Sequence, residues 1–329
     1  MMNKILFWLK NARYIALPQS LFPAFLASVM AAQHSNFSLT LTILSVLGVI
    51  AVHLGANLTD DYFDYKRNKE AIMSQSYPTQ SPIRKGKCNY LVHNKTTMQA
   101  LLKVIVFIFS FSLLIASIAY IYRGIIVLYY VLIAGFLSIS YSGFPFRLSY
   151  HGLGELIVGL MFGPLLMSGI YYVGTGGFSS AVWMISVCVG LLVTNILYVH
   201  SLMDYNSDKN IQKKTLAILI RNKNANMIVA FIVIFLPYFI LLFGVFFRVL
   251  SKAYGFLFIL LPLSIYLYYI LFHYIYATKK TFTPRWWMGY MEQWKAIKEA
   301  GIDQFMLRWL LARNICMFFC ILASIICFV

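Results

Sequence analysis

The chain has 329 residues, of which 61% are hydrophobic and only 11% carry a charge, and its mean hydropathy is +0.76. Such a composition excludes a soluble protein. The formal net charge of +17 does not indicate a nucleic-acid partner, because an excess of Lys and Arg is typical of cytoplasmic loops and of contact with anionic lipid. We therefore predict a membrane protein whose partners include membrane lipids but no nucleic acid.

Apolar runs of about 20 residues recur along the chain, and runs of that length cross a bilayer as helices. They predict an all-α, polytopic fold with nine transmembrane helices. The predicted spans lie near residues 14–33, 39–59, 98–120, 125–142, 153–174, 181–201, 226–248, 254–276 and 307–328. The basic N-terminus continues into the first span without a small-residue cleavage site, so no cleavable signal peptide is expected.

The positive charges predict how these helices are oriented. Only Arg123, Arg248 and Lys252 fall in the loops of one side, whereas the other Lys and Arg residues lie on the opposite side or at the span ends that face it. The positive-inside rule then places the N-terminus inside and the C-terminus outside. We expect a bacterial inner (cytoplasmic) membrane, with the basic side facing the cytoplasm.

The ten acidic residues are concentrated in two short stretches. Most of them are Asp60, Asp61, Asp64, Glu70, Asp204 and Asp208. The first group follows the second predicted span and the other follows the sixth, so both lie on the cytoplasmic side. We expect a single transmembrane domain with one half at 1–150, a second half at 151–276, and an interfacial segment with the ninth helix at 277–329. Internal repeats of this kind place a shared site between the halves.

Carboxylates three or four positions apart share one face of a helix, and this holds for Asp61 with Asp64 and for Asp204 with Asp208. Carboxylates that face one another repel unless a cation lies between them. Oxygen ligands without His or Cys in zinc spacing favour Mg²⁺ or Ca²⁺, and Mg²⁺ keeps part of its coordination shell for substrate phosphates. The predicted metal ligands are Asp60, Asp61, Asp64, Asp204 and Asp208.

Basic residues flank both acidic groups and would bind the oxygens of a diphosphate. They are Lys66, Arg67, Arg84, Lys209, Lys213 and Lys214. Acidic groups with basic flanks beside a lipid-facing cavity indicate a substrate with a diphosphate head and a hydrocarbon tail. Two other interpretations remain: solvated acidic loops without a site, and a cation-coupled transporter. Transporter acids usually lie near the bilayer midplane at broken helices, whereas these lie at helix ends, which favours an enzyme.

The connection at 277–306 contains Trp286, Trp287 and Trp294 among acidic and basic residues. This pattern predicts an amphipathic helix that lies in the membrane interface and anchors the chain there. The five cysteines show no metal-ligand spacing. They are expected to be ordinary buried thiols.

Several motifs match a known family. The run D-D-Y-F-D at 60–64 is similar to an N-D-x-x-D motif, D-x-x-x-D occurs at 204–208, and K-K-T-L-A follows at 213–217. Asn-Leu at 57–58 and Y-S-G-x-P at 141–145 add to the match. On these motifs the chain resembles the UbiA superfamily of intramembrane prenyltransferases. The resemblance is greatest to the MenA branch, which prenylates 1,4-dihydroxy-2-naphthoate in menaquinone biosynthesis.

The resemblance covers roughly residues 10–225 and includes departures from the family pattern. Asp60 stands where the family usually has Asn, and Asn68 and Glu70 stand where Gly and Asp are usual. His200 stands where Asn is expected. All of these positions lie in or beside the two acidic motifs.

The resemblance implies Mg²⁺-dependent transfer of an isoprenyl chain from a polyprenyl diphosphate to an aromatic acceptor. The acceptor implied first is 1,4-dihydroxy-2-naphthoate, and another aromatic or lipid acceptor is the alternative. The catalytic residues would be Asp61, Asp64, Asp204 and Asp208. The substrate-binding residues would be Asn57, Lys66, Arg67, Arg84, Tyr141, Arg147, Lys209, Lys213 and Lys214.

Three tyrosines, Tyr62, Tyr141 and Tyr205, are candidates for contact with the allylic cation, although core packing is the commoner role of an aromatic residue in such a chain. Arg147 would hold an acceptor carboxylate, or would extend to the lipid interface as an ordinary loop residue. Glu155, an acid at the start of the fifth span, would make an inward polar contact, support the structure or take part in catalysis.

Overall fold

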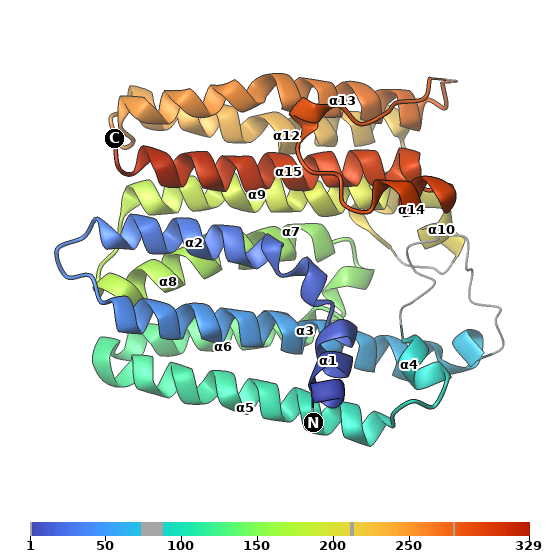
Figure 1. The fold of residues 1–329 in the computed structure, drawn as a ribbon, viewed down its shortest axis with the longest axis horizontal. Coiled ribbons are helices and arrows are strands. Elements are labelled where there is room, and N and C mark those ends of the chain that lie inside the picture. Colours follow the sequence, from blue (N-terminus) through green and yellow to red (C-terminus); the bar gives the residue numbers. More distant parts are fainter. Residues whose placement is uncertain (1, 74–87, 211–213, 279) are drawn as a thin grey trace.

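The computed structural model describes residues 2–73, 88–210, 214–278 and 280–329. In that part of the chain the secondary structure is helical, apart from one isolated β-bridge between His151 and Lys214. Figure 1 shows the long helices lying side by side along the longest axis, with α12, α13 and α15 at one side of the bundle and α5 and α6 at the other. The short helices α4, α10 and α14 lie together at one end.

The helices before residue 150 are α1 (Met2–Asn11), α2 (Pro18–Ala32), α3 (Leu39–Met73), α4 (Asn89–Val92), α5 (Met98–Arg123) and α6 (Ile125–Ser140). Those after it are α7 (Gly154–Leu160), α8 (Leu166–Thr175), α9 (Ser180–Met203), α10 (Tyr205–Asn210), α11 (Leu216–Ile220), α12 (Lys223–Phe246), α13 (Leu261–Ile275), α14 (Trp294–Glu299) and α15 (Asp303–Ile326). A π-helical turn, η4 (Met161–Leu165), joins α7 to α8, and 3₁₀ helices occur at η1 (Tyr14–Ala16), η3 (Leu148–Tyr150), η5 (Lys252–Leu260) and η6 (Trp286–Met288).

Among the described residues, seven helical segments are long and apolar enough to cross a membrane. They are Leu39–Arg67, Met98–Arg123, Gly154–Thr175, Ser180–Met203, Lys223–Phe246, Lys252–Ile275 and Asp303–Ile326. Two shorter apolar helices, α2 and α6, occupy the places of the first and fourth predicted spans. The order of the apolar helices is therefore the predicted one, and seven of them are long enough to cross a membrane.

Helix α3 continues well beyond the second predicted span. It has 35 residues, and at 1.5 Å per residue it is about 50 Å long, which exceeds the roughly 30 Å of a bilayer core. No Gly or Pro interrupts residues 56–73, so the helix does not end where the apolar residues end. The first acidic group consequently lies on helix α3 itself and not in a loop.

Helix α9 runs through the main core and is buried for most of its length between α2, α12, α15 and the α7–α8 pair. Its contact with α7 and η4 is close because glycines face one another there. A Cβ atom at Gly163 would collide with the backbone at Ser186 and Gly190. Such small-residue contacts let membrane helices approach closely, and this one fixes the direction in which α9 leads to Asp204.

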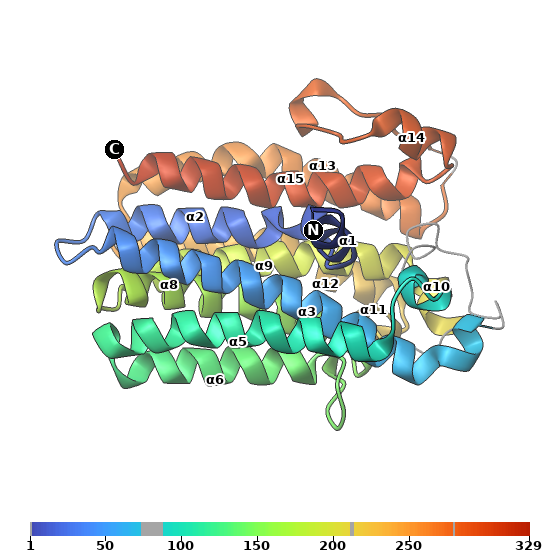
Figure 2. The ribbon, with the colours of Figure 1, turned by 60° about the horizontal axis from the view of Figure 1, so that its bottom comes forward.

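The segment 277–306 differs from its prediction. Of the expected amphipathic helix only the six-residue α14 and the turn η6 are present, and most other described residues of the segment are neither helix nor strand. Pro284 and Gly289, the latter with φ +84°, account for the interruption. Figure 2 shows the segment as a loop over the outer side of α15.

Candidate functional site

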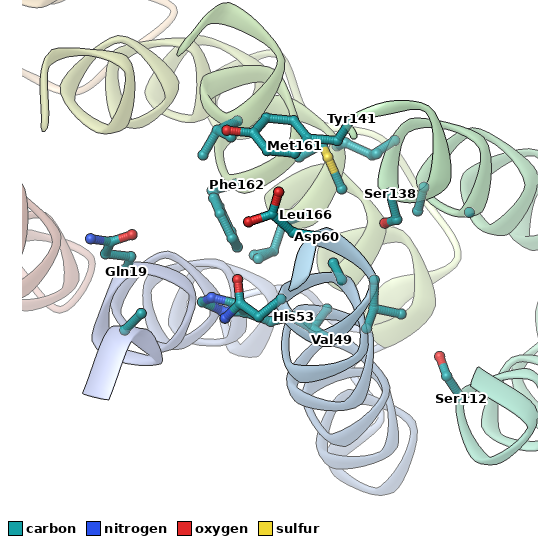
Figure 3. A pocket seen from close by; sticks show the side chains of 18 of the residues that line it. Gln19, Val49, His53, Asp60, Ser112, Ser138, Tyr141, Met161, Phe162 and Leu166 are labelled. Carbon is teal, nitrogen blue, oxygen red and sulfur yellow. The ribbon is translucent and has the colours of Figure 1, made fainter. Parts of the chain in front are cut away.

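A cavity of about 870 Å³ extends through the bundle between α3, α5, α6 and the α7–α8 pair. One end reaches Ala119, Val127 and Val173 and is apolar. The other end carries most of the polar residues that line the cavity, among them Lys10, Asn11, Arg13, Asn57, Asp60, Asp61, Tyr90, Tyr141, Ser149, Glu155, His200, Ser201, Asp208 and Thr215. Figure 3 shows Asp60 and Tyr141 facing this space together with apolar side chains such as Phe162 and Leu166.

Both acidic groups contribute to the polar end of this one cavity. Asp60 and Asp61 come from α3, and Asp208 comes from α10. Asp61 is only 2% exposed and Asp208 only 1%. The carboxylates are therefore not solvated surface groups, and the structure brings together acids that are separated by about 140 positions in the sequence.

Arg13 lies between the first two carboxylates. Its guanidinium donates from Nη1 and Nη2 to Oδ2 of Asp60, both at 3.3 Å, and also donates to Asp61. Desolvation by the surrounding protein would lower the pKa of Arg13, but Asp61 and Asp60 raise it above its ordinary value. Arg13 is thus a fixed positive charge at the cavity wall. From its place in the sequence, Arg13 was expected only to contribute to the positive charge of the cytoplasmic side.

The local backbone explains how Arg13 reaches the site. Arg13 has φ 58° and ψ 50°, a left-handed conformation, at the start of η1. Asn57 of α3 donates from Nδ2 to the carbonyl oxygen of Ala12 at 2.9 Å. Asn57 was predicted to bind substrate. It lines the cavity and also holds the turn that presents Arg13.

Three hydroxyl groups from other elements hold the carboxylates of α3. Tyr90 of α4 donates to Oδ2 of Asp61 at 3.2 Å, and Ser142 donates to Oδ1 of Asp60 at 2.5 Å. Tyr150 of η3 donates to Oδ1 of Asp64 at 2.7 Å. Burial, and then the charge of Asp61, raise the pKa of Tyr90. The phenol therefore stays protonated and remains a donor.

The second acidic group is held by its own helix turn and by His200. The Nδ1 atom of His200 lies 3.5 Å from Oδ2 of Asp204, and the amide of Asp208 donates to the carbonyl of Asp204 at 2.8 Å. His200, the residue that departs from the family pattern, lines the cavity. Its ring also meets Phe305 of α15 edge-on.

Glu155 is buried and accepts from Ser201 Oγ at 2.5 Å and from the amide of Leu216 at 3.2 Å. These contacts join α7 to α9 and to α11. Of the roles expected for Glu155, a structural one has direct support in these contacts. Its carboxylate also lines the cavity beside the second acidic group.

The remaining predicted residues are distributed unevenly. Of the three candidate tyrosines, Tyr141 lines the cavity, and Tyr62 and Tyr205 do not. Arg67 places its guanidinium over the ring of Tyr150 at 4.3 Å, close to Asp64, and Arg147 lies over Phe144 at 5.5 Å. The side chains of Lys66, Lys209 and Lys214 are exposed outside the cavity lining. Arg84 and Lys213 lie outside the described residues.

The oxygen-rich end fits Mg²⁺ by its chemistry. In the described part of the chain no three His, Cys, Asp or Glu side chains converge closely enough to enclose a metal ion. A closed cage is not what Mg²⁺ requires, since it is usually held by one or two carboxylates together with substrate phosphates. Buried carboxylates on two sides of one cavity satisfy that requirement, and Arg13 supplies the positive charge between Asp60 and Asp61.

The sequence profile of the UbiA prenyltransferase family matches residues 20–289. The 1,4-dihydroxy-2-naphthoate octaprenyltransferase of Escherichia coli (strain K12) is 24% identical over 222 residues, which cover 66% of this chain and 70% of that protein. The enzyme of the same name from Bacillus subtilis (strain 168) is 26% identical over 218 residues, or 65% and 66% of the two chains. The two proteins have the same naphthoate acceptor in their names.

Solved structures show the same fold. A UbiA homologue from Archaeoglobus fulgidus bound to GPP and Mg²⁺ superimposes with a TM-score of 0.60 at 13% identity, covering 98% of this chain and 99% of that one. A structure of digeranylgeranylglyceryl phosphate synthase superimposes with a TM-score of 0.57 at 15% identity and the same coverage. The helix arrangement described above is therefore an arrangement seen in experimental structures.

Proposed function

Because this chain belongs to the UbiA prenyltransferase family and is an integral membrane prenyltransferase, we propose that it transfers an isoprenyl chain from a polyprenyl diphosphate to 1,4-dihydroxy-2-naphthoate. The observation that carries the proposal is the shape of the cavity, whose polar end holds both acidic groups and whose remainder is mostly apolar. A diphosphate head and a hydrocarbon tail would occupy these two parts. The naphthoate acceptor is supported by the names of the relatives from E. coli and B. subtilis, and another aromatic or lipid acceptor is the alternative.

In this proposal Asp60, Asp61 and Asp64 of α3 and Asp204 and Asp208 of the other half would hold Mg²⁺. When bound, the ion would neutralise charge that develops on the leaving diphosphate. The buried hydroxyls of Tyr90 and Tyr150 orient Asp61 and Asp64 by donating to them. Arg13 lines the cavity and would donate to a diphosphate oxygen there.

The apolar part of the cavity has two tasks. It would hold the prenyl chain away from water, and it would keep water from the allylic carbon when the diphosphate leaves. Tyr141 lines the cavity at the polar end, where its ring would face the developing allylic cation. A second tyrosine on the wall, Tyr130, lies further along the apolar part.

We further propose nine membrane spans, with the shorter α2 and α6 crossing as the first and fourth. The N-terminus and the polar end of the cavity would face the cytoplasm of a bacterial inner membrane, and the C-terminus would lie outside. The distribution of Lys and Arg supports this orientation. Figure 1 supports it as well, since α4 and α10, which border the acidic groups, lie at the end of the bundle opposite the C-terminus.

The proposal is tested with purified protein in detergent, supplied with dihydroxynaphthoate, a long-chain prenyl diphosphate and Mg²⁺. Diphosphate release and a prenylated, decarboxylated product are expected, and both should stop when EDTA removes the metal. Asp61→Ala and Asp208→Ala should each lower the rate at least about 100-fold, because each removes a buried carboxylate from the cavity wall. Glu299→Ala, which removes an exposed acid on α14, is the matched control. Unchanged activity in both aspartate variants would contradict the proposal.

A further inference from the structure

His53 is a buried, polar side chain inside the cavity for which the reaction outlined above has no role. It is 7% exposed and lines the cavity on the same helix as the first acidic group. Positions 53, 57 and 60 are spaced by four and three residues, so their side chains share one face of α3. His53 lies seven residues before Asp60, which at 1.5 Å per residue places it about 10 Å deeper along the helix.

The hydrogen bonds of Ser20 indicate which nitrogen of His53 carries the proton. Ser20 of α2 donates its hydroxyl proton to the carbonyl of Leu17 at 3.0 Å. The same oxygen lies 2.7 Å from Nδ1 of His53. With the Ser20 hydroxyl donating to Leu17, Nδ1–H of His53 is the donor to the Ser20 oxygen. A neutral imidazole in this tautomer has an unprotonated Nε2 with a free lone pair.

The Nε2 atom has no hydrogen-bond partner among the described residues, and the side chain faces the cavity. The ring of Phe162 lies 4.9 Å from the imidazole, with an angle of 53° between the two planes. Figure 3 shows His53, Phe162 and Asp60 around one space, with Val49 and Leu166 beside it. The site combines apolar and aromatic walls with a hydrogen-bond acceptor at His53. A flat aromatic ring that carries a hydroxyl group fits this combination.

We propose that Nε2 of His53 binds the hydroxyl group of the aromatic acceptor and takes its proton during prenyl transfer; this deepens, and rests on, the proposed function. The ring carbon forms a bond to C1 of the prenyl chain while the C1–O bond breaks and its electron pair leaves with the diphosphate. The hydroxyl proton passes to Nε2, and the ring oxygen becomes a carbonyl. Loss of CO₂ from the alkylated carbon restores the aromatic ring as its oxyanion, which recovers the proton from Nε2.

The depth of His53 agrees with this order of bonds. The diphosphate lies at the carboxylates, so C1 lies on the apolar side of them. An acceptor ring held at His53 would approach C1 from that side, at a level between Asp60 and the apolar end of the cavity. Packing in the core would explain the hydrogen bond between His53 and Ser20. It would not explain why Nε2 faces the cavity without a hydrogen-bond partner among the described residues.

Two substitutions of His53 separate binding from proton transfer. His53→Leu should raise the KM for dihydroxynaphthoate about tenfold, since one hydrogen bond in a buried site is lost. It should also lower kcat about 100-fold, the lower limit for losing a general base. His53→Gln keeps a hydrogen-bond acceptor, so its KM should stay within about threefold of wild type while kcat falls as in His53→Leu. The Kd for the prenyl diphosphate, measured by equilibrium dialysis, should change less than about twofold in either variant.

His273→Leu is the matched control, because His273 lies on α13 and bonds only to Thr278 within the described residues. Wild-type kinetics in His53→Leu would overturn the inference. An equal loss of diphosphate affinity would do so too, since it would mean that His53 only supports the structure. If the wild-type protein binds the prenyl diphosphate but never alkylates the naphthoate, the proposed function fails. If the enzyme is active and the His53 variants have wild-type kinetics, only the inference about His53 fails.

Ser20 acts through His53 and is a positioning residue. Ser20→Ala frees Nδ1, so that part of the population adopts the tautomer with a protonated Nε2, which cannot accept from the substrate. The acceptor KM should rise about fivefold with the diphosphate Kd unchanged, and Ser20→Thr should restore it. A Ser20→Ala variant with an unchanged acceptor KM would show that Ser20 does not set the tautomer. The same effect is checked without turnover by measuring the Kd for the acceptor in Ser20→Ala and Ser20→Thr variants that also carry Asp61→Asn, which blocks transfer.

Discussion

Arg13 shows how much of the site depends on one residue far from the acidic motifs. Its side chain is 38% exposed, whereas the side chain of Asp61 is 3% exposed. Without Arg13, the two adjacent carboxylates lose the guanidinium that donates to both of them. We expect Arg13→Ala to lower the free energy of unfolding by about 1–3 kcal/mol, below the cost for a fully buried pair because solvent screens the guanidinium.

Mg²⁺ should reverse this loss, because the ion supplies the missing positive charge. The measurement is thermal unfolding followed by tryptophan fluorescence, with and without Mg²⁺, and the ion should raise Tm more in Arg13→Ala than in wild type. Arg221→Ala is the control, since Arg221 also has a positive φ, of 60°, but an exposed side chain. Equal responses to Mg²⁺ in wild type and Arg13→Ala would argue against a metal between these carboxylates.

The acidic residues of the site could be predicted from the sequence because carboxylates are rare in this chain and their spacing is that of a helix face. Their partners could not. Arg13, Ser142 and Tyr150 reach the carboxylates from 47, 82 and 86 positions away, and nothing in the local pattern distinguishes them from other basic or hydroxyl residues. His53 was missed for the same reason, since it sits in an apolar stretch.

At the scale of the element, a hydropathy pattern can predict a helix that is too short, as in α3, or a helix that does not form, as in 277–306. The pattern places the end of a span where the apolar residues end, but α3 continues as helix through the acidic motif because no residue there stops it. In 277–306, aromatic and charged residues alternate suitably for a helix, yet Pro284 and Gly289 prevent one. Backbone constraints, not polarity, decide where helices end.

The same segment is attached to α15 by side chains within that helix. Asn314 donates from Nδ2 to the carbonyls of Met288 and Tyr290, at 2.9 and 3.1 Å. At Gly289, between them, a Cβ atom would lie 2.6 Å from the ring of Phe318. Buried carbonyls that lose their donor are costly, so this attachment is specific.

Asn314→Leu should therefore release the segment. We expect the free energy of unfolding to fall by about 1–3 kcal/mol, and limited proteolysis between 280 and 293 to become at least several-fold faster. Ser324→Ala is the control, because Ser324 lies on α15 but donates only to Cys320 of its own helix. Unchanged proteolysis in Asn314→Leu would show that other contacts hold the segment.

At the scale of the molecule, the cavity ends against Ala119 of α5 and Val127 of α6. Ala119→Phe should shorten the apolar part. The rate of transfer of a long prenyl chain should fall at least about tenfold, because the new ring would overpack the end of the chain at a cost of about 1–3 kcal/mol. The rate of transfer of a geranyl group should stay within about threefold, because the shorter chain would not reach the new ring. Leu102→Phe, at an exposed position of the same helix, is the control. A parallel loss with both chain lengths would mean that the chain does not extend to Ala119.

The orientation of the whole molecule can be measured independently of activity. In a background without native cysteines, a membrane-impermeant maleimide applied to intact cells should label Asn36→Cys, which lies between α2 and α3. It should not label Lys223→Cys, at the start of α12, until the cells are permeabilised. Both positions are exposed in the structure. The reverse labelling pattern would place the polar end of the cavity outside.

The unbroken helix from His53 to Asp64 sets a rule for how this region of the chain can vary. Each residue turns an α-helix by about 100°, so one inserted or deleted residue between His53 and Asp60 would swing the imidazole away from the cavity while the carboxylates stayed in it. Substitutions in this stretch leave the register intact, but changes in its length do not. Differences in substrate between such enzymes would then arise by substitution between His53 and Asp64. They would also arise in helices α5 and α6, which line the same cavity but carry neither the imidazole nor the carboxylates.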